Sequence, residues 1–346
     1  MRRIILIILL LYGMCIPAYA TDLEAPEAPE DIQSTMPADS ESFAGGVWFV
    51  VKTAIKTLQP DLAEGIRICL SILLLSVLTS VLRSFPGKTA DLVDMTGTVA
   101  AAGILLTGTH SLIGAAAETI GKLSDYGNLL LPVMAAAVAS QGGAASATAL
   151  YSGTAIFDAL LSNLISSILV PVIYVFLAAA LAESVLDVHL LQRIKHFLKW
   201  LITWCLKTIL YIFTGYVSIT GVVAGSTDKT ALKAAKLTIS GAVPVVGGII
   251  SDASEALLVS AGMVKNSVGI YGLWVTIALA IGPFLRIGVH YLLLKAMVAI
   301  CGIFAGKKMT GLLQDFSTAM GLLLGMTGAV SLLFIISTVC FMKGAG

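Results

Sequence analysis

The sequence predicts an all-α protein: a polytopic integral membrane helix bundle with about seven to eight spans and one or two broken or re-entrant segments. Three observations lead to this class. Hydrophobic residues make up 58% of the chain. Charged residues make up only 12%, against roughly 25% in a soluble domain, so the chain cannot build the polar surface of a soluble protein. Several apolar stretches also reach the ~20 residues that a helix needs to cross a bilayer.

The first twenty residues have the pattern of a cleavable secretory signal peptide. Arg2 and Arg3 give the charged start, residues 4–11 the apolar centre, and Ala18 and Ala20 the small residues of a cleavage site. An uncleaved amino-terminal anchor is the alternative. Cleavage would leave the mature amino terminus outside the cytoplasm.

Residues 21–62 are expected to form an acidic, flexible extracytoplasmic tail that includes a short amphipathic stretch at 48–58, and residues 63–346 a multi-spanning membrane domain. Residues 21–42 have three prolines and few apolar residues, so this part of the tail cannot bury a core of its own. Between residues 22 and 41 it carries no base and seven acids: Asp22, Glu24, Glu27, Glu30, Asp31, Asp39 and Glu41.

Seven apolar stretches are predicted to cross the bilayer. The run 267–305 is too long for one span, and Pro283 and Arg286 divide it in two. The seven spans lie near 65–83, 95–117, 160–182, 200–223, 267–285, 287–305 and 319–342.

Two further apolar segments, 127–150 and 240–262, are interrupted by proline or glycine. The first contains Pro132 and the second contains Pro244. Broken segments of this kind line cavities in transport proteins, because non-helical backbone at membrane depth needs protein or water partners. An ordinary kinked helix is the alternative, since proline and glycine are common in membrane helices.

The positions of the basic residues test the orientation. Cytoplasmic loops carry an excess of lysine and arginine, and a first span that starts outside brings Arg83 to the cytoplasm. The residues 187–201 have apolar side chains at helical spacing with Arg193, Lys195 and Lys199 opposite. They are therefore predicted to form a basic amphipathic helix on the anionic cytoplasmic surface. The side of the carboxyl terminus stays open.

No motif in the sequence indicates catalysis, so we expect a protein that is not an enzyme. A phosphate loop, a nucleophile elbow and a zinc-protease helix are all absent from the sequence. The cysteines show neither disulfide nor metal spacing, and we expect no cofactor and no metal. A net charge of +1 gives no reason to expect nucleic acid binding.

Charged residues at membrane depth are the first group of candidate functional residues, since each costs roughly 2.5–3.5 kcal/mol to insert. The candidates are Asp158, Glu183 and Lys295. Lys295 falls in the middle of a predicted span. It either pairs inside the bundle, for instance with Glu183 or Asp158, or reaches the membrane surface with its long side chain.

The segment 229–255 gives the second group of candidates. A helix with its lysines on one face runs into an apolar stretch broken by proline and two glycines, and a plausible cap for a new helix follows. The exposed backbone of such a break needs partners. The predicted pore or contact motif consists of Lys233, Lys236, Pro244, Gly247, Gly248, Ser251 and Asp252.

This segment resembles the stage III sporulation protein AE family of endospore-forming bacteria. The similarity lies in Lys233-Ala234-Ala235-Lys236, in the stretch from Val243 to Gly248, and in Ser251-Asp252-Ala253. It extends over most of the chain, and the acidic residues 22–41 are the least similar part. The central motif is fairly specific, whereas apolar helices match many proteins.

The resemblance implies a non-enzymatic membrane subunit of the channel or feeding complex between mother cell and forespore, pore-forming or permease-like. Its implied partners are the other stage III A-operon membrane proteins and, directly or indirectly, stage II sporulation protein Q. The implied location is the mother-cell membrane around the forespore, as a multi-pass protein. A free-standing secondary transporter of a small solute is the alternative, and a scaffold without a conducting path is a third possibility.

Overall fold

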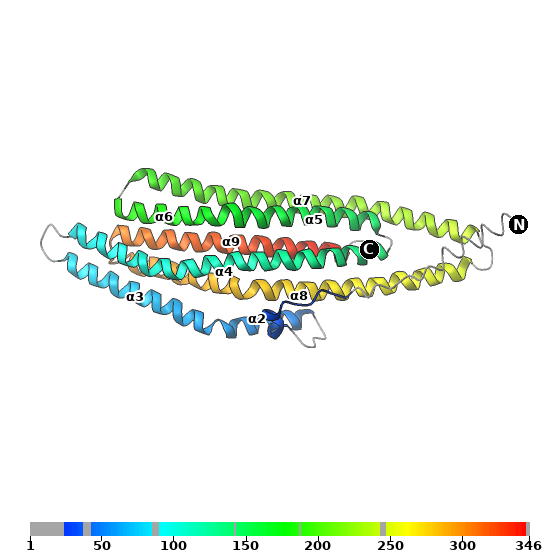
Figure 1. Ribbon diagram of the computed structural model, residues 1–346, viewed down its shortest axis with the longest axis horizontal. Helices are drawn as coiled ribbons and strands as arrows, with labels where there is room; N and C mark the ends of the chain where they lie inside the picture. The colour runs from blue at the N-terminus through cyan, green and yellow to red at the C-terminus, as the bar shows by residue number, and fades with distance from the viewer. Residues whose placement is uncertain are drawn as a thin grey trace.

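The computed structural model describes residues 24–36, 43–84, 90–141, 143–186, 188–242 and 247–343, with the backbone alone at 43–44 and 221–265. The predicted signal peptide, residues 1–20, lies outside the described residues. Long helices lie side by side in an elongated bundle (Figure 1). The described part of the chain contains helices and no strand, which confirms the all-α class.

Two helices, α2 (Phe43–Thr57) and α3 (Gln59–Arg83), precede the first very long helix, α4 (Ala90–Ser140). Pro60 is in the first turn of α3, where a missing N–H costs little because that group has no partner within the helix. The 51 residues of α4 extend about 76 Å. That is more than twice the ~30 Å hydrocarbon core of a bilayer.

After α4 the chain turns back and forms a helical hairpin. The returning arm of this hairpin is one helix with a widened turn. It consists of α5 (Ala144–Leu164), the π-helical turn η2 (Ile165–Leu169) and α6 (Val170–Leu186). Pro171 explains the wide turn. Proline has no N–H for the preceding turn, and its ring crowds the carbonyl four residues earlier.

Three more helices complete the bundle: α7 (His189–Ala242), α8 (Gly247–Cys301) and α9 (Lys307–Lys343). The last of these is central, since α9 packs against α4, α5, α6, α7 and α8 (Figure 1). Its side chains toward these neighbours are large and apolar, and Phe316, Phe334 and Phe341 are at most 1% exposed. The core of the bundle therefore lies along α9.

The bundle has two different ends (Figure 1). At the first, α3 ends and α4 begins, α6 ends and α7 begins, and α8 ends and α9 begins. We call it the cavity end. At the second, α4 is followed by α5. We call it the hairpin end.

Six helical stretches among the described residues are long and apolar enough to cross a membrane. They confirm a polytopic membrane bundle. They are fewer than the seven or eight counted from the sequence, because α8 continues through Pro283 and the two spans predicted within 267–305 form one helix. The six are Gln59–Arg83, Ala90–Ser140, Ala144–Leu186, His189–Thr220, Asn266–Cys301 and Lys307–Lys343.

The two ambiguous segments have different outcomes. Residues 127–150 form the tip of the α4–α5 hairpin, since α4 continues through Pro132 to Ser140 before α5 begins. They are not a separate broken or re-entrant helix. In 240–262, α7 ends at Ala242 and α8 begins at Gly247, and the intervening residues lie outside the described chain.

Part of the acidic tail lies on the bundle. In the 3-10 turn η1 (Glu30–Thr35), Ile32 is buried and Asp31 forms an ion pair with Lys122 of α4 at 2.5 Å. The backbone N–H of Ala28 donates a hydrogen bond to the hydroxyl of Tyr271 on α8 (3.3 Å). Residues 24–36 are therefore anchored, where composition predicted a flexible tail. Two buried apolar residues, Ala28 and Ile32, and one ion pair are too few to change the composition of the segment.

Candidate functional site

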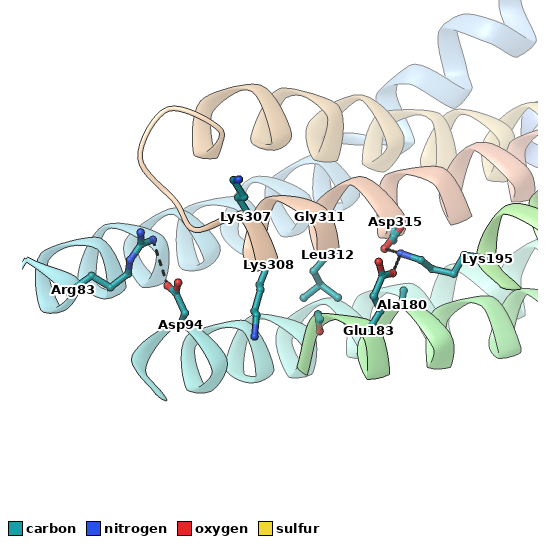
Figure 2. A pocket seen from close by; sticks show the side chains of 11 residues that line it. Arg83, Asp94, Ala180, Glu183, Lys195, Lys307, Lys308, Gly311, Leu312 and Asp315 are labelled. Atoms are coloured by element: carbon teal, nitrogen blue, oxygen red, sulfur yellow. Dashed lines mark hydrogen bonds and ion pairs between the residues drawn. The ribbon is translucent and has the colours of Figure 1, made fainter. Parts of the chain in front are cut away.

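Charged side chains from five helices surround a cavity of about 480 Å³ at the cavity end (Figure 2). Helices α3, α4, α6, α7 and α9 all contribute to it. We call it the charged cavity. Its lining residues are Arg83, Asp94, Ala180, Glu183, Ser184, Lys195, Lys307, Lys308, Gly311, Leu312 and Asp315.

Lys195 of α7 joins three helices at the inner side of this cavity. Its ammonium group forms ion pairs with Glu183 of α6 and Asp315 of α9. The side chain of Lys195 is 11% exposed, and those of Glu183 and Asp315 are 24% and 19% exposed. An ion-paired lysine with this little access to water holds the three helices in one arrangement, because separating them would leave charges unpaired. We call these three residues the Lys195 triad.

A second ion pair closes the outer side of the cavity. Arg83 at the end of α3 lies 3.3 Å from Asp94 on α4, measured between Nη1 and Oδ1. Gly306, just before α9, makes room for it, because a Cβ there would lie 2.9 Å from both carboxylate oxygens of Asp94. The junction between α8 and α9 therefore packs directly against the pair.

Lys307 and Lys308 bring the remaining positive charge. Among the described residues, neither lysine has an ion-pair partner. Figure 2 shows the side chain of Lys308 between the Arg83–Asp94 pair and the Lys195 triad. The cavity thus combines paired carboxylates with two lysines that remain available to an anion.

The structure corrects the predicted role of Lys195. The sequence placed it on the solvated face of a surface helix at 187–201, but the helix is the start of α7 and Lys195 is buried. The apolar side chains of Leu190 and Phe197 are exposed, at 63% and 57%. The other two bases of the predicted polar face, Arg193 and Lys199, are exposed. Lys195 departs from that face because partners from α6 and α9 satisfy its charge, whereas the leucine and phenylalanine face outward.

The other two intramembrane candidates lie elsewhere. Asp158 of α5 is 1% exposed and accepts hydrogen bonds from Ser124 (3.1 Å) and Ser162 (3.3 Å). The ammonium of Lys295 lies 5.8 Å from the centre of the Tyr291 ring on the same helix. Lys295 therefore pairs with neither of the acids considered from the sequence, and only Glu183 of the three reaches the charged cavity.

The candidate motif at 233–252 is described only in part. Lys233 and Lys236 belong to α7, and Gly247, Gly248, Ser251 and Asp252 belong to α8, with the backbone alone described. Pro244 lies outside the described residues.

The sequence did not lead us to Asp315, which is one of the two acidic ion-pair partners of Lys195. One signal could have found it. Asp315 is the single acidic residue between Glu255 and the carboxyl terminus, in a stretch otherwise occupied by apolar residues and a few bases. An isolated acid next to a membrane span needs a partner.

Known proteins with a similar sequence are consistent with this architecture. The profile of the stage III sporulation protein AE family matches residues 35–345. Stage III sporulation protein AE of Bacillus subtilis (strain 168) is 26% identical over 234 residues, which cover 68% of this chain and 59% of that protein. No solved structure matches. The family profile spans every helix of the bundle, so this chain belongs to the stage III sporulation protein AE family, a family of sporulation membrane proteins and not a known enzyme family.

Proposed function

We propose that this chain is a non-enzymatic membrane subunit of the complex that connects the mother cell with the forespore. Its location in the cell would be the mother-cell membrane around the forespore. The observation that carries the proposal is the family match along nearly the whole bundle. The other stage III A-operon membrane proteins, and stage II sporulation protein Q directly or indirectly, are the proposed partners.

The charged residues support one placement of the bundle in the membrane. On α4, Asp94 and Glu118 are 24 residues apart, which is about 36 Å along a helix. Asp158 and Glu183 are 25 residues apart on the return arm, or about 37 Å. Both distances fit the ~30 Å core with an acidic residue at the level of each surface, of which Asp158 lies inside the bundle.

The exposed side chains between these two charged levels differ in size and polarity from many of those toward the hairpin end. Between the two charged levels, the outer faces of the helices carry large apolar side chains such as Leu74, Val99 and Val175, each at least half exposed. Lipid-facing surfaces have this character. Toward the hairpin end, many exposed positions are small or polar, among them Asn128, Ala136, Ser140, Thr148 and Ser152.

The basic residues favour the cytoplasm for the cavity end. Arg83, Arg193, Lys199, Lys307 and Lys308 all lie there, and cytoplasmic surfaces carry the excess of lysine and arginine. The acidic tail lies on α4 next to Lys122, well away from that end. An extracytoplasmic tail and a cytoplasmic cavity follow from the same orientation, which brings the end of α9 to the outer side.

A conducting path, in this proposal, lies between chains of the complex. The described interior of one chain is filled, because α9 packs against five other helices and its phenylalanines Phe316, Phe334 and Phe341 are fully buried. Large exposed aromatic side chains on α7, among them Trp200, Trp204 and Tyr211, leave that helix available for contacts with lipid or other subunits. A subunit that contributes one wall of a passage fits this arrangement better than a self-contained transporter.

The break between α7 and α8 is the proposed contact element. Replacing Gly247 and Gly248 by leucine would raise helix propensity and block close approach of another chain. We expect a strain carrying this double substitution to lose forespore gene activity after engulfment and to form few spores. Leucine at both Gly114 and Gly121 of α4 is the matched control, since a Cβ at either meets no atom within 4 Å.

The measurement is spore yield and a forespore-specific reporter in replacement strains, with membrane abundance of each variant quantified. Loss in the Gly247/Gly248 variant at normal abundance, with a normal control, supports a contact role for the break. Normal sporulation of a strain that lacks the whole chain would overturn the proposed function. Normal sporulation of the Gly247/Gly248 variant alone would show that the break is a tolerated feature.

A further inference from the structure

The charged cavity has a surplus of positive charge that its own side chains leave unmatched. Four basic residues and three acidic residues line it, so its balance is +4 and −3, or +1. All three acids are engaged, Asp94 with Arg83 and the other two with Lys195. The surplus therefore resides on Lys307 and Lys308, which lack ion-pair partners in the part of the chain that the structure describes.

We propose that the charged cavity binds a phosphate-bearing anion, with Lys308 as its principal ligand and Lys307, which also lines the cavity, as a second source of positive charge. Lysine ammonium groups are common phosphate ligands. Arg83 can assist, because its ion pair with Asp94 engages one of its nitrogens and a guanidinium has five N–H donors. A cavity of about 480 Å³ has room for a phosphate group together with the organic part attached to it.

The two ion-paired groups explain why an anion is accepted despite three carboxylates in the lining. Each carboxylate has a cation as its partner, although Glu183 and Asp315 share Lys195 and keep one negative charge between them. Lys308 extends between the two groups (Figure 2) and Lys307 adds a further positive charge, so the balance of the cavity stays positive. Lys307, which also lines the cavity, points to the other side of α9 (Figure 2). An anion held at Lys308 would thus meet positive charge nearby without direct contact with an unpaired carboxylate.

The anion can come from two sources, a phospholipid headgroup or a free phosphate compound. Three exposed aromatic rings on α7 favour the headgroup. Phe197, Trp200 and Trp204 lie next to one another with ring centres 5.9 Å apart, starting two residues after Lys195. Exposed tryptophans are typical of the headgroup level of a bilayer, and basic pockets between helices on the cytoplasmic side bind anionic headgroups.

The test is anion binding to the purified full chain in a neutral detergent. Native mass spectrometry and thermal stability are measured with phosphatidylglycerol, with phosphatidylcholine and with inorganic phosphate. The test variant is Lys307→Gln with Lys308→Gln. The control is Lys343→Gln, which removes one positive charge at the opposite end of the same helix and so matches either single substitution. Binding needs no sporulating cell, so this inference and the proposed function can fail separately.

Affinity for phosphatidylglycerol should fall about fivefold per lysine, or roughly 25-fold in the double variant, and stay unchanged in the control. If the double variant melts at the wild-type temperature in the absence of anion, its fold is intact. If that value is lowered, Lys308→Gln alone is measured, with a fivefold loss expected. If phosphatidylglycerol binds and inorganic phosphate does not, the natural anion is a lipid headgroup. If inorganic phosphate displaces phosphatidylglycerol, the natural anion is a free phosphate compound. Binding of both anions that is unaffected by the substitutions would overturn the proposal.

Discussion

Replacing Lys195 by methionine is expected to destabilise the bundle more than any other single charge removal. The substitution leaves Glu183 and Asp315 facing each other without a cation, both with little access to water. Breaking a buried ion pair on one side costs about 3–5 kcal/mol, and the partial exposure of the acids places the expected loss near 3 kcal/mol. For a chain of 346 residues, with about 2.1 cal/mol/K of unfolding entropy per residue, that corresponds to a decrease of roughly 4 °C in the melting temperature.

The control for this experiment is Lys199→Met, one helical turn further along α7 on an exposed position. It removes the same charge and adds the same side chain, so little change in melting temperature is expected. Adding Glu183→Gln and Asp315→Asn to the Lys195 variant should recover a large part of the loss, because the unpaired charges are then gone. Equal melting temperatures for Lys195→Met and Lys199→Met in detergent would contradict the role of the triad.

Leucine in place of Gly127 is expected to have a comparable effect through packing. A Cβ at this position of α4 would lie 1.9 Å from the ring of Phe334, which is itself 1% exposed and cannot move aside. Overpacking a core costs about 1–3 kcal/mol and occasionally more, and a whole leucine side chain against an immobile ring should reach the upper value. The expected result is low abundance in the membrane and a clearly lowered melting temperature.

Gly114→Leu provides the comparison within the same helix. Gly114 is exposed and a Cβ there meets no atom within 4 Å. Leucine at this position should be neutral or slightly stabilising, because it has a better helix propensity by up to about 1 kcal/mol. Similar stability of the two variants would mean that α4 and α9 are not packed face to face at Gly127.

Apolar length was enough to predict a helical membrane bundle, because a span needs ~20 apolar residues whatever it packs against. The same criterion failed at Pro283, since the sequence of one helix does not show whether neighbours support a proline inside it. At Pro132 the sequence left a broken segment and an ordinary kinked helix open, and α4 continues to Ser140. Helix class was therefore predictable, whereas the ends of the helices depended on packing.

The charged cavity could be predicted only in pieces. Glu183 was singled out because it is an acid at the end of an apolar stretch. Its partner Lys195 was assigned to the surface, and Asp315 is 120 residues further along the chain. No periodicity connects residues on three different helices, so the triad becomes visible only when the fold brings α6, α7 and α9 together.

The orientation of the bundle is tested most directly by single-cysteine labelling in vegetative cells, where reagents reach the outer face of the cell membrane. Cysteines are placed at Gln192 near the cavity end and at Ser140 at the hairpin end, both exposed positions, in a background without Cys69, Cys205, Cys301 and Cys340. An impermeant maleimide should label Ser140→Cys in intact cells, and Gln192→Cys only after permeabilisation. Labelling of Gln192→Cys in intact cells would contradict a cytoplasmic cavity end.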